Sequence, residues 1–367
     1  MEIILVVVIT LALAAGNGAN DNFKGAATLL GSGVTDYRRA LAFATIATAA
    51  GAMASIMLAS GLLATFGGRG IVPDAIAGSG LFLGSVGVAA ATTVWLATRL
   101  GFPISTTHAL VGGLLGAGFA AAPDAVNTSA ALRAMFLPLL LSPLVAIALS
   151  LALVPILRRL QRVVSTQPTP CVCVELTAEA QNATATARTA LLVGNSEDPR
   201  CAPAQASVVA NLTIKRSIDA MHYLSAGAVS FARGLNDTPK IAALMVAVGA
   251  ASPLASSFAV ALAMAIGGWL AARRVGSTMA HGITRMNPTE GLGGNIVTAL
   301  LVIFASRFGL PVSTTHVSCG ALFGIAAGNK QGRLATIAAI LGAWLITLPL
   351  AALLAFTVFS SVRHFIQ

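Results

Sequence analysis

Two carboxylates stand inside otherwise apolar sequence, and each belongs to a copy of the same short motif. The copies read Gly18-Ala-Asn-Asp-Asn-Phe-Lys24 and Gly234-Leu-Asn-Asp-Thr-Pro-Lys240. Burying an Asp in a membrane is costly, so such a residue marks a functional site by default. Asp21 and Asp237 could hold a cation or carry a proton, and nearby glycines would permit an unwound segment whose carbonyls assist. The alternative is that each Asp caps a helix at the membrane surface.

A basic residue follows each Asp at helical spacing. Lys24 and Lys240 lie three residues after the carboxylates, on the same helix face. Each could pair with its Asp inside the membrane or supply positive charge to an anion. Arg233 precedes the second copy, where the first copy has Asn17. It is a weaker candidate for contact with a substrate or a gate.

A second motif is also duplicated, downstream of each Asn-Asp motif. Arg99-Leu-Gly-Phe-Pro-Ile-Ser-Thr-Thr-His108 recurs as Arg307-Phe-Gly-Leu-Pro-Val-Ser-Thr-Thr-His316. Gly and Pro end one helix, and Ser is a strong N-cap for the next. A helix that begins within the membrane presents free N–H groups and the positive end of its dipole, to which hydroxyls add donors. One copy alone would favour a capped interfacial turn, but two copies favour an anion site. The predicted anion cradle comprises Ser105, Thr106, Thr107, Ser313, Thr314 and Thr315.

Three titratable residues are candidates for a proton carrier or a gate. His108 and His316 close the second motif, and they could carry protons or orient the Thr hydroxyls. Glu290 precedes a predicted span and could accept a proton or stand in an interfacial turn. Asn295, further along that span, is a candidate polar lining group.

Composition places these motifs in a membrane. The chain has 367 residues, of which 56% are hydrophobic and 9% are charged, whereas soluble domains carry about 25% charged residues. The net charge of +10 fits basic residues gathered at cytoplasmic helix ends. Without a basic stripe interleaved with aromatic residues, we expect no nucleic-acid partner. The expected fold class is all-α, a polytopic helical membrane protein in the cell membrane.

The duplication divides the chain into repeat A (1–160), a polar linker (161–214) and repeat B (215–367). The positive-inside rule places both termini outside and the linker in the cytoplasm. Five hydrophobic elements per repeat make the two repeats inverted, a hallmark of secondary transporters with a site near mid-membrane. Elements interrupted by Gly and Pro could be broken or re-entrant helices. The predicted elements are 3–30, 38–66, 76–100, 104–122 and 131–158, then 217–249, 253–272, 291–307, 312–328 and 333–361.

The linker is expected to be a mobile loop with a short helix near 174–192. Its Cys171, Cys173 and Cys201 lack the spacing of a zinc site, so we expect reduced, incidental thiols and no cofactor. Residues 3–20 lack a basic flank and are expected to be a retained span rather than a signal peptide.

Together the two duplicated motifs resemble those of the inorganic phosphate transporter (PiT) family, over nearly the whole chain outside 161–214. The resemblance implies inverted repeats and symport of phosphate with sodium or protons. It assigns the Ser-Thr-Thr residues to the anion cradle. It assigns Asn20, Asp21, Asn236 and Asp237 to the region that couples the cation to the substrate.

The chain departs from the pattern of that family at one place. Sodium-coupled members often have Asn where this chain has Lys24 and Lys240. An ammonium could occupy the volume of a bound sodium ion, so we expect proton coupling through Asp21 and Asp237. A sodium ion at these two carboxylates is the alternative.

The sequence therefore predicts a transporter, not an enzyme, that imports phosphate by alternating access. Sulfate transport by the same fold is the first alternative, because sulfate is also a tetrahedral oxyanion, and an anion channel is the second. A membrane-embedded hydrolase would need an activated nucleophile or clustered metal ligands, which the motifs lack. Whether the protein is a homodimer is left open.

Overall fold

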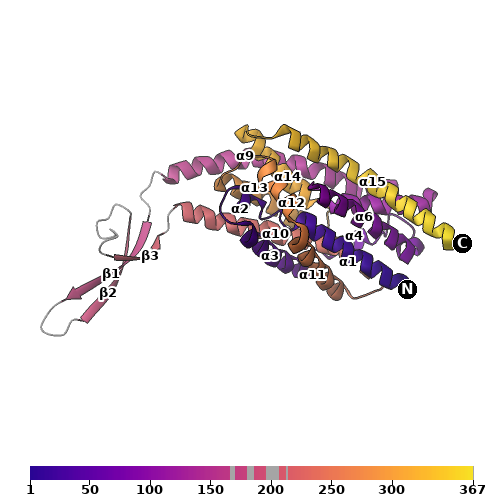
Figure 1. Ribbon diagram of the computed structural model, residues 1–367, viewed down its shortest axis with the longest axis horizontal. Helices are drawn as coiled ribbons and strands as arrows, with labels where there is room; N and C mark the ends of the chain where they lie inside the picture. The colour runs from indigo at the N-terminus through magenta and orange to yellow at the C-terminus, as the bar shows by residue number, and fades with distance from the viewer. Residues whose placement is uncertain (166–169, 180–185, 196–205, 212–213, 367) are drawn as a thin grey trace.

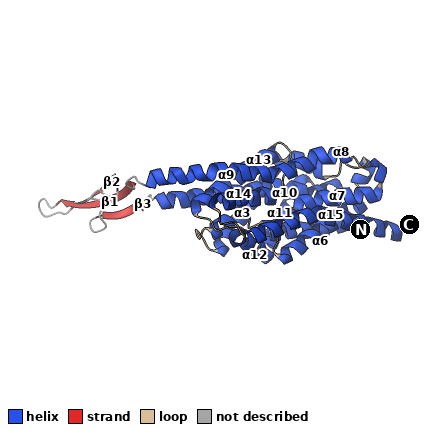
Figure 2. Ribbon diagram, turned by 90° about the horizontal axis from the view of Figure 1, so that it is seen from above, coloured by secondary structure: helices blue, strands red, loops and turns tan. Residues whose placement is uncertain are grey.

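A small sheet projects from one end of an elongated helical body (Figure 1). The computed structural model describes residues 1–165, 170–179, 186–195, 206–211 and 214–366. Both chain termini lie at the end of the body opposite the sheet (Figure 2). The long helices run roughly between these two ends, so this axis is the direction in which the chain crosses a bilayer.

The first half of the chain begins with a helix that stops at the first Asp of the duplicated motif. α1 (Glu2–Asp21) is followed by a turn and then by the short α2 (Ala27–Gly31). The remaining elements of this half are α3 (Tyr37–Leu58), α4 (Ser60–Phe66), α5 (Asp74–Ala77), α6 (Gly80–Leu100), α7 (Thr106–Ala121), η1 (Pro123–Ala125), α8 (Thr128–Ala131), η2 (Leu132–Phe136) and α9 (Leu137–Ser165).

The second half begins with a helix that does not stop at its Asp. α10 (Ile214–Ala247) runs through Asp237 and Pro239 without a break. The remaining elements are α11 (Pro253–Ala271), α12 (Arg273–Ser277), η4 (Thr278–Gly282), α13 (Pro288–Arg307), α14 (Thr314–Asn329) and α15 (Leu334–Ile366).

The glycines of the first motif serve helix packing in both halves. A Cβ on Gly18 would lie 1.9 Å from the backbone oxygen of Met264, and one on Gly234 would lie 2.0 Å from that of Thr48. These glycines therefore let α1 approach α11 and α10 approach α3. The expected unwound segment exists after Asp21, but the expectation was wrong for the second copy, where the helix continues.

The second motif has the local structure that its sequence predicts. Gly101 and Gly309 adopt left-handed φ values of 80° and 67° after α6 and α13. The Oγ atoms of Ser105 and Ser313 then accept hydrogen bonds from the backbone N–H groups of His108 and His316, each at 3.1 Å. Both serines are thus N-caps of helices that begin inside the protein, as predicted.

The linker contains strands in place of the expected helix. β1 (Pro170–Glu179), β2 (Thr186–Asn195) and β3 (Ala206–Asn211) form an antiparallel sheet in the order β2-β1-β3. The prediction of a helix near 174–192 was wrong, because β-branched residues recur through these segments and favour extended backbone. Cys171 and Cys173 lie in β1, whereas Cys201 lies outside the described residues.

Helices at matching positions in the two halves pack against helices that also match. α1 packs on α6 and α11, while α10 packs on α13 and α3. Likewise α7 packs on α15, and α14 packs on α9. α1 begins at the end far from the sheet and α10 begins beside the sheet, so these two helices enter the body from opposite ends (Figure 1). This pattern supports the division into two inverted repeats, which we keep as a proposal.

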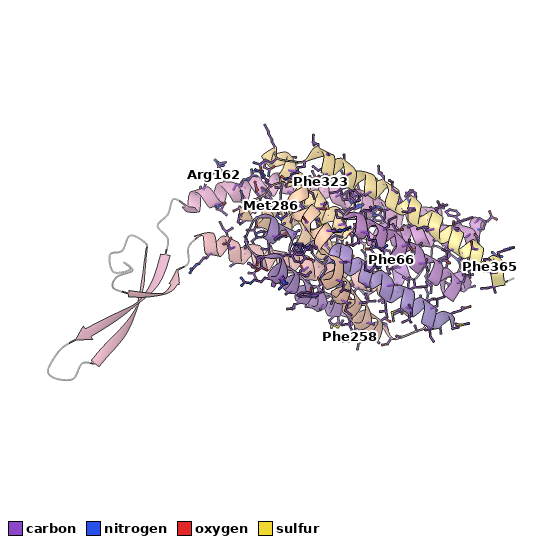
Figure 3. The ribbon with its side chains drawn as sticks, in the orientation of Figure 1. Phe66, Arg162, Phe258, Met286, Phe323 and Phe365 are labelled. Carbon is purple, nitrogen blue, oxygen red and sulfur yellow. The ribbon has the colours of Figure 1, made fainter. Side chains whose placement is uncertain are left out.

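The helical body has the length and surface of a multi-pass membrane protein. Seven of the described helices are long and apolar enough to span a bilayer, namely α1, α3, α6, α9, α11, α13 and α15. Apolar side chains such as Phe258 and Phe365 point outward, whereas Phe66 is fully buried (Figure 3). α7 and α14 have 16 residues each, so they are the short, broken elements that the sequence predicts.

Candidate transport site

Two carboxylates and three cations meet inside the helical body. Asp21 and Asp237 lie with Lys24, Arg233 and Lys240, and each of these residues is at most 3% exposed. The group carries one more positive than negative charge when every member is ionised. Because unpaired buried charges are costly, these side chains must satisfy one another and the polar groups around them.

In the first half, the ammonium of Lys24 contacts two oxygens. One is the Oδ1 of Asp21, and the other is the Oγ1 of Thr315 on α14. The second oxygen of Asp21 accepts a hydrogen bond from the Nδ2 of Asn17 at 3.0 Å. The same amide nitrogen donates to the Oγ1 of Thr106 at 2.9 Å, which joins the two duplicated motifs of this half.

In the second half, the ammonium of Lys240 has an environment like that of Lys24. Its Nζ lies 2.9 Å from the Oγ1 of Thr107 on α7 and 2.6 Å from the backbone oxygen of Val312. The Oδ1 of Asp237 is 3.8 Å away. The other carboxylate oxygen of Asp237 accepts a hydrogen bond from the Oγ1 of Thr314 at 3.2 Å.

The two lysines therefore reach across the boundary between the halves. Each ammonium faces a carboxylate of its own half and a threonine hydroxyl of the other half. Carboxylate, hydroxyl and carbonyl oxygens are also the ligands of hard cations such as sodium. That the ammonium groups take the place of a bound sodium ion stays a prediction.

Arg233 links the two halves of the cluster. Its Nη2 donates to the Oδ1 of Asn17 at 2.6 Å, and its Nη1 donates to the Oδ1 of Asn22 at 3.0 Å. Its Nε lies 3.9 Å from an oxygen of Asp237. The sequence singled out Arg233 but assigned no role to Asn17 and Asn22, although both stand close to Asp21 in the chain and could have been noticed for that reason.

The two asparagines of the first motif hold the turns before α7 and α14. The Nδ2 of Asn20 donates to the Oγ1 of Thr98 and to the backbone oxygen of Phe102, each at 3.0 Å. The Nδ2 of Asn236 donates to the backbone oxygen of Val312 at 3.2 Å, and the Oγ of Ser306 donates to its Oδ1 at 3.1 Å. Here both side chains are positioning residues, so direct contact with a substrate stays a prediction.

The six residues of the predicted anion cradle converge on the charged cluster. All six are buried. Ser105 and Ser313 cap their helices, and the four threonines contact the Asp, Asn and Lys side chains of the cluster. Thr315 also donates to the backbone oxygen of Ile104 at 2.6 Å. The structure thus brings the two motifs together from both halves, and binding of an anion there remains a prediction.

The two motif histidines lie against each other. The ring centroids of His108 and His316 are 4.4 Å apart, and His316 stacks on Trp344 at 3.8 Å. Both histidines line a largely apolar cavity of about 470 Å³ between α9 and α15. These aromatic and apolar surroundings do not support a role of the two histidines as proton carriers, so that role stays a prediction.

Glu290 takes part in a separate cluster near the sheet end. Its carboxylate pairs with Arg158, and it closes a capping box with Asn287 at the start of α13. Glu290 also lines a polar cavity of about 780 Å³ with Arg158 and Arg162. These contacts match the turn interpretation of Glu290, and a proton-carrying role stays a prediction.

A polytopic helical body with a buried charged site between two half-helices defines the class of this protein as a membrane transporter. Residues 17–355 match the model of the phosphate transporter family, and the chain belongs to this family. The resemblance inferred from the two motifs is thereby confirmed. The family consists of transporters, which agrees with the prediction that the chain is not an enzyme.

Curated relatives and a solved structure resemble the chain along most of its length. A Mycobacterium leprae protein named "Probable low-affinity inorganic phosphate transporter" is 27% identical over 364 residues, which cover 95% of this chain and 75% of the relative. The Arabidopsis thaliana "Inorganic phosphate transporter 2-1, chloroplastic" is 25% identical over 415 residues, covering 92% and 68%. A solved structure named "The sodium-dependent phosphate transporter" superposes with a TM-score of 0.76 at 20% identity, covering 99% of both chains.

Proposed function

We propose that this chain imports inorganic phosphate by ion-coupled symport with alternating access, and that the coupling ion is the proton. The observation that carries the proposal is the crossed contact of the two lysines with the threonines of the opposite half. The residues that neutralise the carboxylates thus also touch the hydroxyls that would cradle the anion. Binding of cation and binding of anion are therefore coupled through the same side chains.

Protonation of a carboxylate would change the charge that the substrate meets. A proton on Asp21 removes the partner of Lys24, and a proton on Asp237 does the same for Lys240. Each proton raises the positive charge of the cluster by one, and the released ammonium can turn to a phosphate oxygen. The anion is then bound best when the carboxylates are protonated, which is the thermodynamic requirement of symport.

Phosphate suits this site better than sulfate. The cluster contains carboxylate oxygens beside the threonine hydroxyls, and a carboxylate can accept a hydrogen bond from phosphate that keeps a proton. Sulfate has no such proton near neutral pH, so it can bind only beside a protonated carboxyl group, whereas phosphate can also share its own proton with a carboxylate that stays ionised. The names of the two relatives, both phosphate transporters, point to the same substrate.

Rocking of the two halves would change the side from which the site is reached. The cluster is buried here, and its crossed contacts join the turn between α1 and α2 to α14, and α10 to α7. A movement of one half against the other must break or exchange these contacts. Alternating access would then follow from two arrangements of the same cluster.

Uptake into proteoliposomes tests the proposal. Radiolabelled phosphate and sulfate are supplied separately, with a proton gradient or a sodium gradient imposed alone. We expect concentrative phosphate uptake that a proton gradient drives and a protonophore abolishes. Strict sodium dependence, the property for which the superposing transporter is named, would replace the proton by sodium. Uptake of sulfate alone would change the substrate, and dissipative flux would indicate a channel.

A further inference from the structure

A polar stripe on α10 continues beyond the charged cluster toward the sheet end. His222 and Ser225 precede Arg233 at helical spacing and face the same side of the helix. Eleven residues of helix separate His222 from Arg233, which corresponds to about 16 Å at 1.5 Å per residue. Both additional residues are buried, so the stripe runs inside the protein.

His222 belongs to a hydrogen-bonded group without charge. Its Nε2 lies 3.0 Å from the Oγ1 of Thr28 on α2. The Nδ2 of Asn295 on α13 donates to the same Thr28 oxygen at 2.9 Å and to the Oγ of Ser225 at 3.3 Å. The Nδ1 of His222 is buried and has no partner among the described residues. The group therefore has a free polar atom as well as several hydroxyl and amide groups.

The corresponding layer of the other half is apolar. Counted from the Asp of each first motif, Val6 matches His222, and Ile9 matches Ser225. Counted from the Ser of each second motif, Gly87 matches Asn295. A Cβ on Gly87 would meet Ile9 at 2.6 Å and Leu244 at 3.2 Å, so this layer is closely packed. At these three matched positions, polar side chains therefore lie only on the sheet side of the cluster. The other half buries Thr10 beside Ile9, but its hydroxyl is bonded to the backbone oxygen of Val6.

This polar group lies directly behind a polar cavity. Gly291 is the neighbour of Glu290, which lines the cavity of about 780 Å³ at the sheet end. A Cβ on Gly291 would lie 2.6 Å from the ring of His222 and 3.2 Å from the Cβ of Thr28. The cavity is also lined by Arg158 and Arg162, which would attract an anion.

We propose that His222, Thr28, Ser225 and Asn295 form a second oxyanion site, which phosphate occupies between the central cluster and this cavity. The proposal rests on the transport of phosphate proposed above. Hydroxyl, amide and imidazole groups can donate to an oxyanion and accept from a protonated one. Because the group carries no fixed charge, it binds weakly enough to let the anion leave, which a site on a transport route requires.

Phosphate binding and phosphate exchange test this site separately. At low phosphate concentration, equilibrium binding to the purified full chain reports the central cluster, because the uncharged second site binds more weakly. Exchange across proteoliposomes reports the whole route. We expect His222→Leu to bind phosphate within about threefold of the unmodified protein but to exchange it at least about tenfold more slowly, because a route hydrogen bond is lost. His222→Gln, whose amide reaches the position of Nε2 and can still pair with Thr28, should keep at least about half of the exchange rate. Ser150→Ala, which removes a buried hydroxyl on α9, is the matched control and should change neither quantity.

Each of the following outcomes would contradict the proposed second oxyanion site. Exchange by His222→Leu at the unmodified rate would exclude it from the route. Equal loss in His222→Gln and His222→Leu, with binding intact, would make His222 a proton relay instead. Absence of phosphate binding to the unmodified protein would overturn the proposed function and this site with it. If His222→Leu does not fold, Gly291→Ala replaces it, because the added methyl would lie 2.6 Å from the ring of His222 and would displace the ring without removing a polar group. Normal exchange by that variant would count against the site.

Discussion

The Nζ of Lys240 lies 2.9 Å from the Oγ1 of Thr107, although the two residues belong to different halves of the chain. The ammonium of Lys24 makes the matching contact with Thr315. A charged group of each half is therefore ligated by the half-helix of the other. This relationship ties the cation chemistry of the site to its anion chemistry, and most of the predictions below test it.

Replacing both lysines by asparagine should create sodium dependence. In Lys24→Asn with Lys240→Asn, the carboxylate, hydroxyl and carbonyl oxygens around each ammonium become free to ligand a metal ion. We expect phosphate uptake by this variant to rise several-fold with a sodium gradient, unlike that of the unmodified protein. The matched variant with methionine at both positions should show no such rise. If a sodium gradient does not change phosphate uptake by the asparagine variant, the ammonium groups do not take the place of a sodium ion.

Thr107→Val should reduce phosphate uptake about tenfold, because it removes a ligand of a buried ammonium at a cost of about 1–3 kcal/mol. Thr107→Ser keeps the hydroxyl and should retain most of the uptake rate. Thr357→Val is the control, since that exposed hydroxyl bonds only to the backbone of its own helix, at Leu353. The initial rate of uptake into proteoliposomes, corrected for the amount of protein inserted, measures the effect. Equal rates for Thr107→Val and Thr107→Ser would show that the hydroxyl is dispensable.

Gly18→Ala should lower the stability of the protein by about 1–3 kcal/mol through overpacking. The new methyl would lie 1.9 Å from the backbone oxygen of Met264, so α1 and α11 must separate. Gly342→Ala is the control, since no atom lies within 4 Å of its added methyl. There the change should be neutral or stabilising by up to about 1 kcal/mol. Thermal unfolding in detergent compares the two, and an unchanged midpoint for Gly18→Ala would refute the close approach.

Glu290→Gln should destabilise the protein without changing its coupling. The substitution removes the charge that pairs with Arg158, and we expect a loss of about 1–3 kcal/mol because the arginine is partly exposed. The ratio of protons to phosphate should stay as in the unmodified protein. Asp124→Asn, at an exposed site, serves as the control. A changed ratio in Glu290→Gln would assign the proton to Glu290 after all.

The double variant His108→Phe with His316→Phe should retain phosphate uptake within about threefold, because phenyl rings can keep the aromatic packing. The ring of His316 stacks on Trp344 and lies tilted against the ring of His108, and both histidines line a largely apolar cavity. Uptake driven by a proton gradient measures the outcome. Loss of proton-driven uptake with phosphate binding preserved would instead identify the pair as proton carriers.

Local features of the fold follow closely from the sequence. Ser105 and Ser313 cap helices after Gly and Pro residues, since the interactions involved span only a few residues. The seven long apolar helices follow from hydropathy alone. The strands of the linker were missed, because their β-branched residues, which favour extended backbone, are mixed with Ala and Glu residues, which favour a helix.

The amino-acid sequence was sufficient to infer that this protein crosses a membrane, is internally duplicated and bears two copies of a polar site, because composition and repeated motifs need no knowledge of packing. It also identified Asp21, Lys24 and their counterparts as charges in an apolar setting. The three-dimensional fold was needed to show that each lysine contacts a threonine of the opposite half. It alone placed His222 against Thr28 and Asn295. Such contacts join residues that are far apart in the chain, so they depend on how the helices pack against one another. The spacing of residues within a motif does not predict this packing.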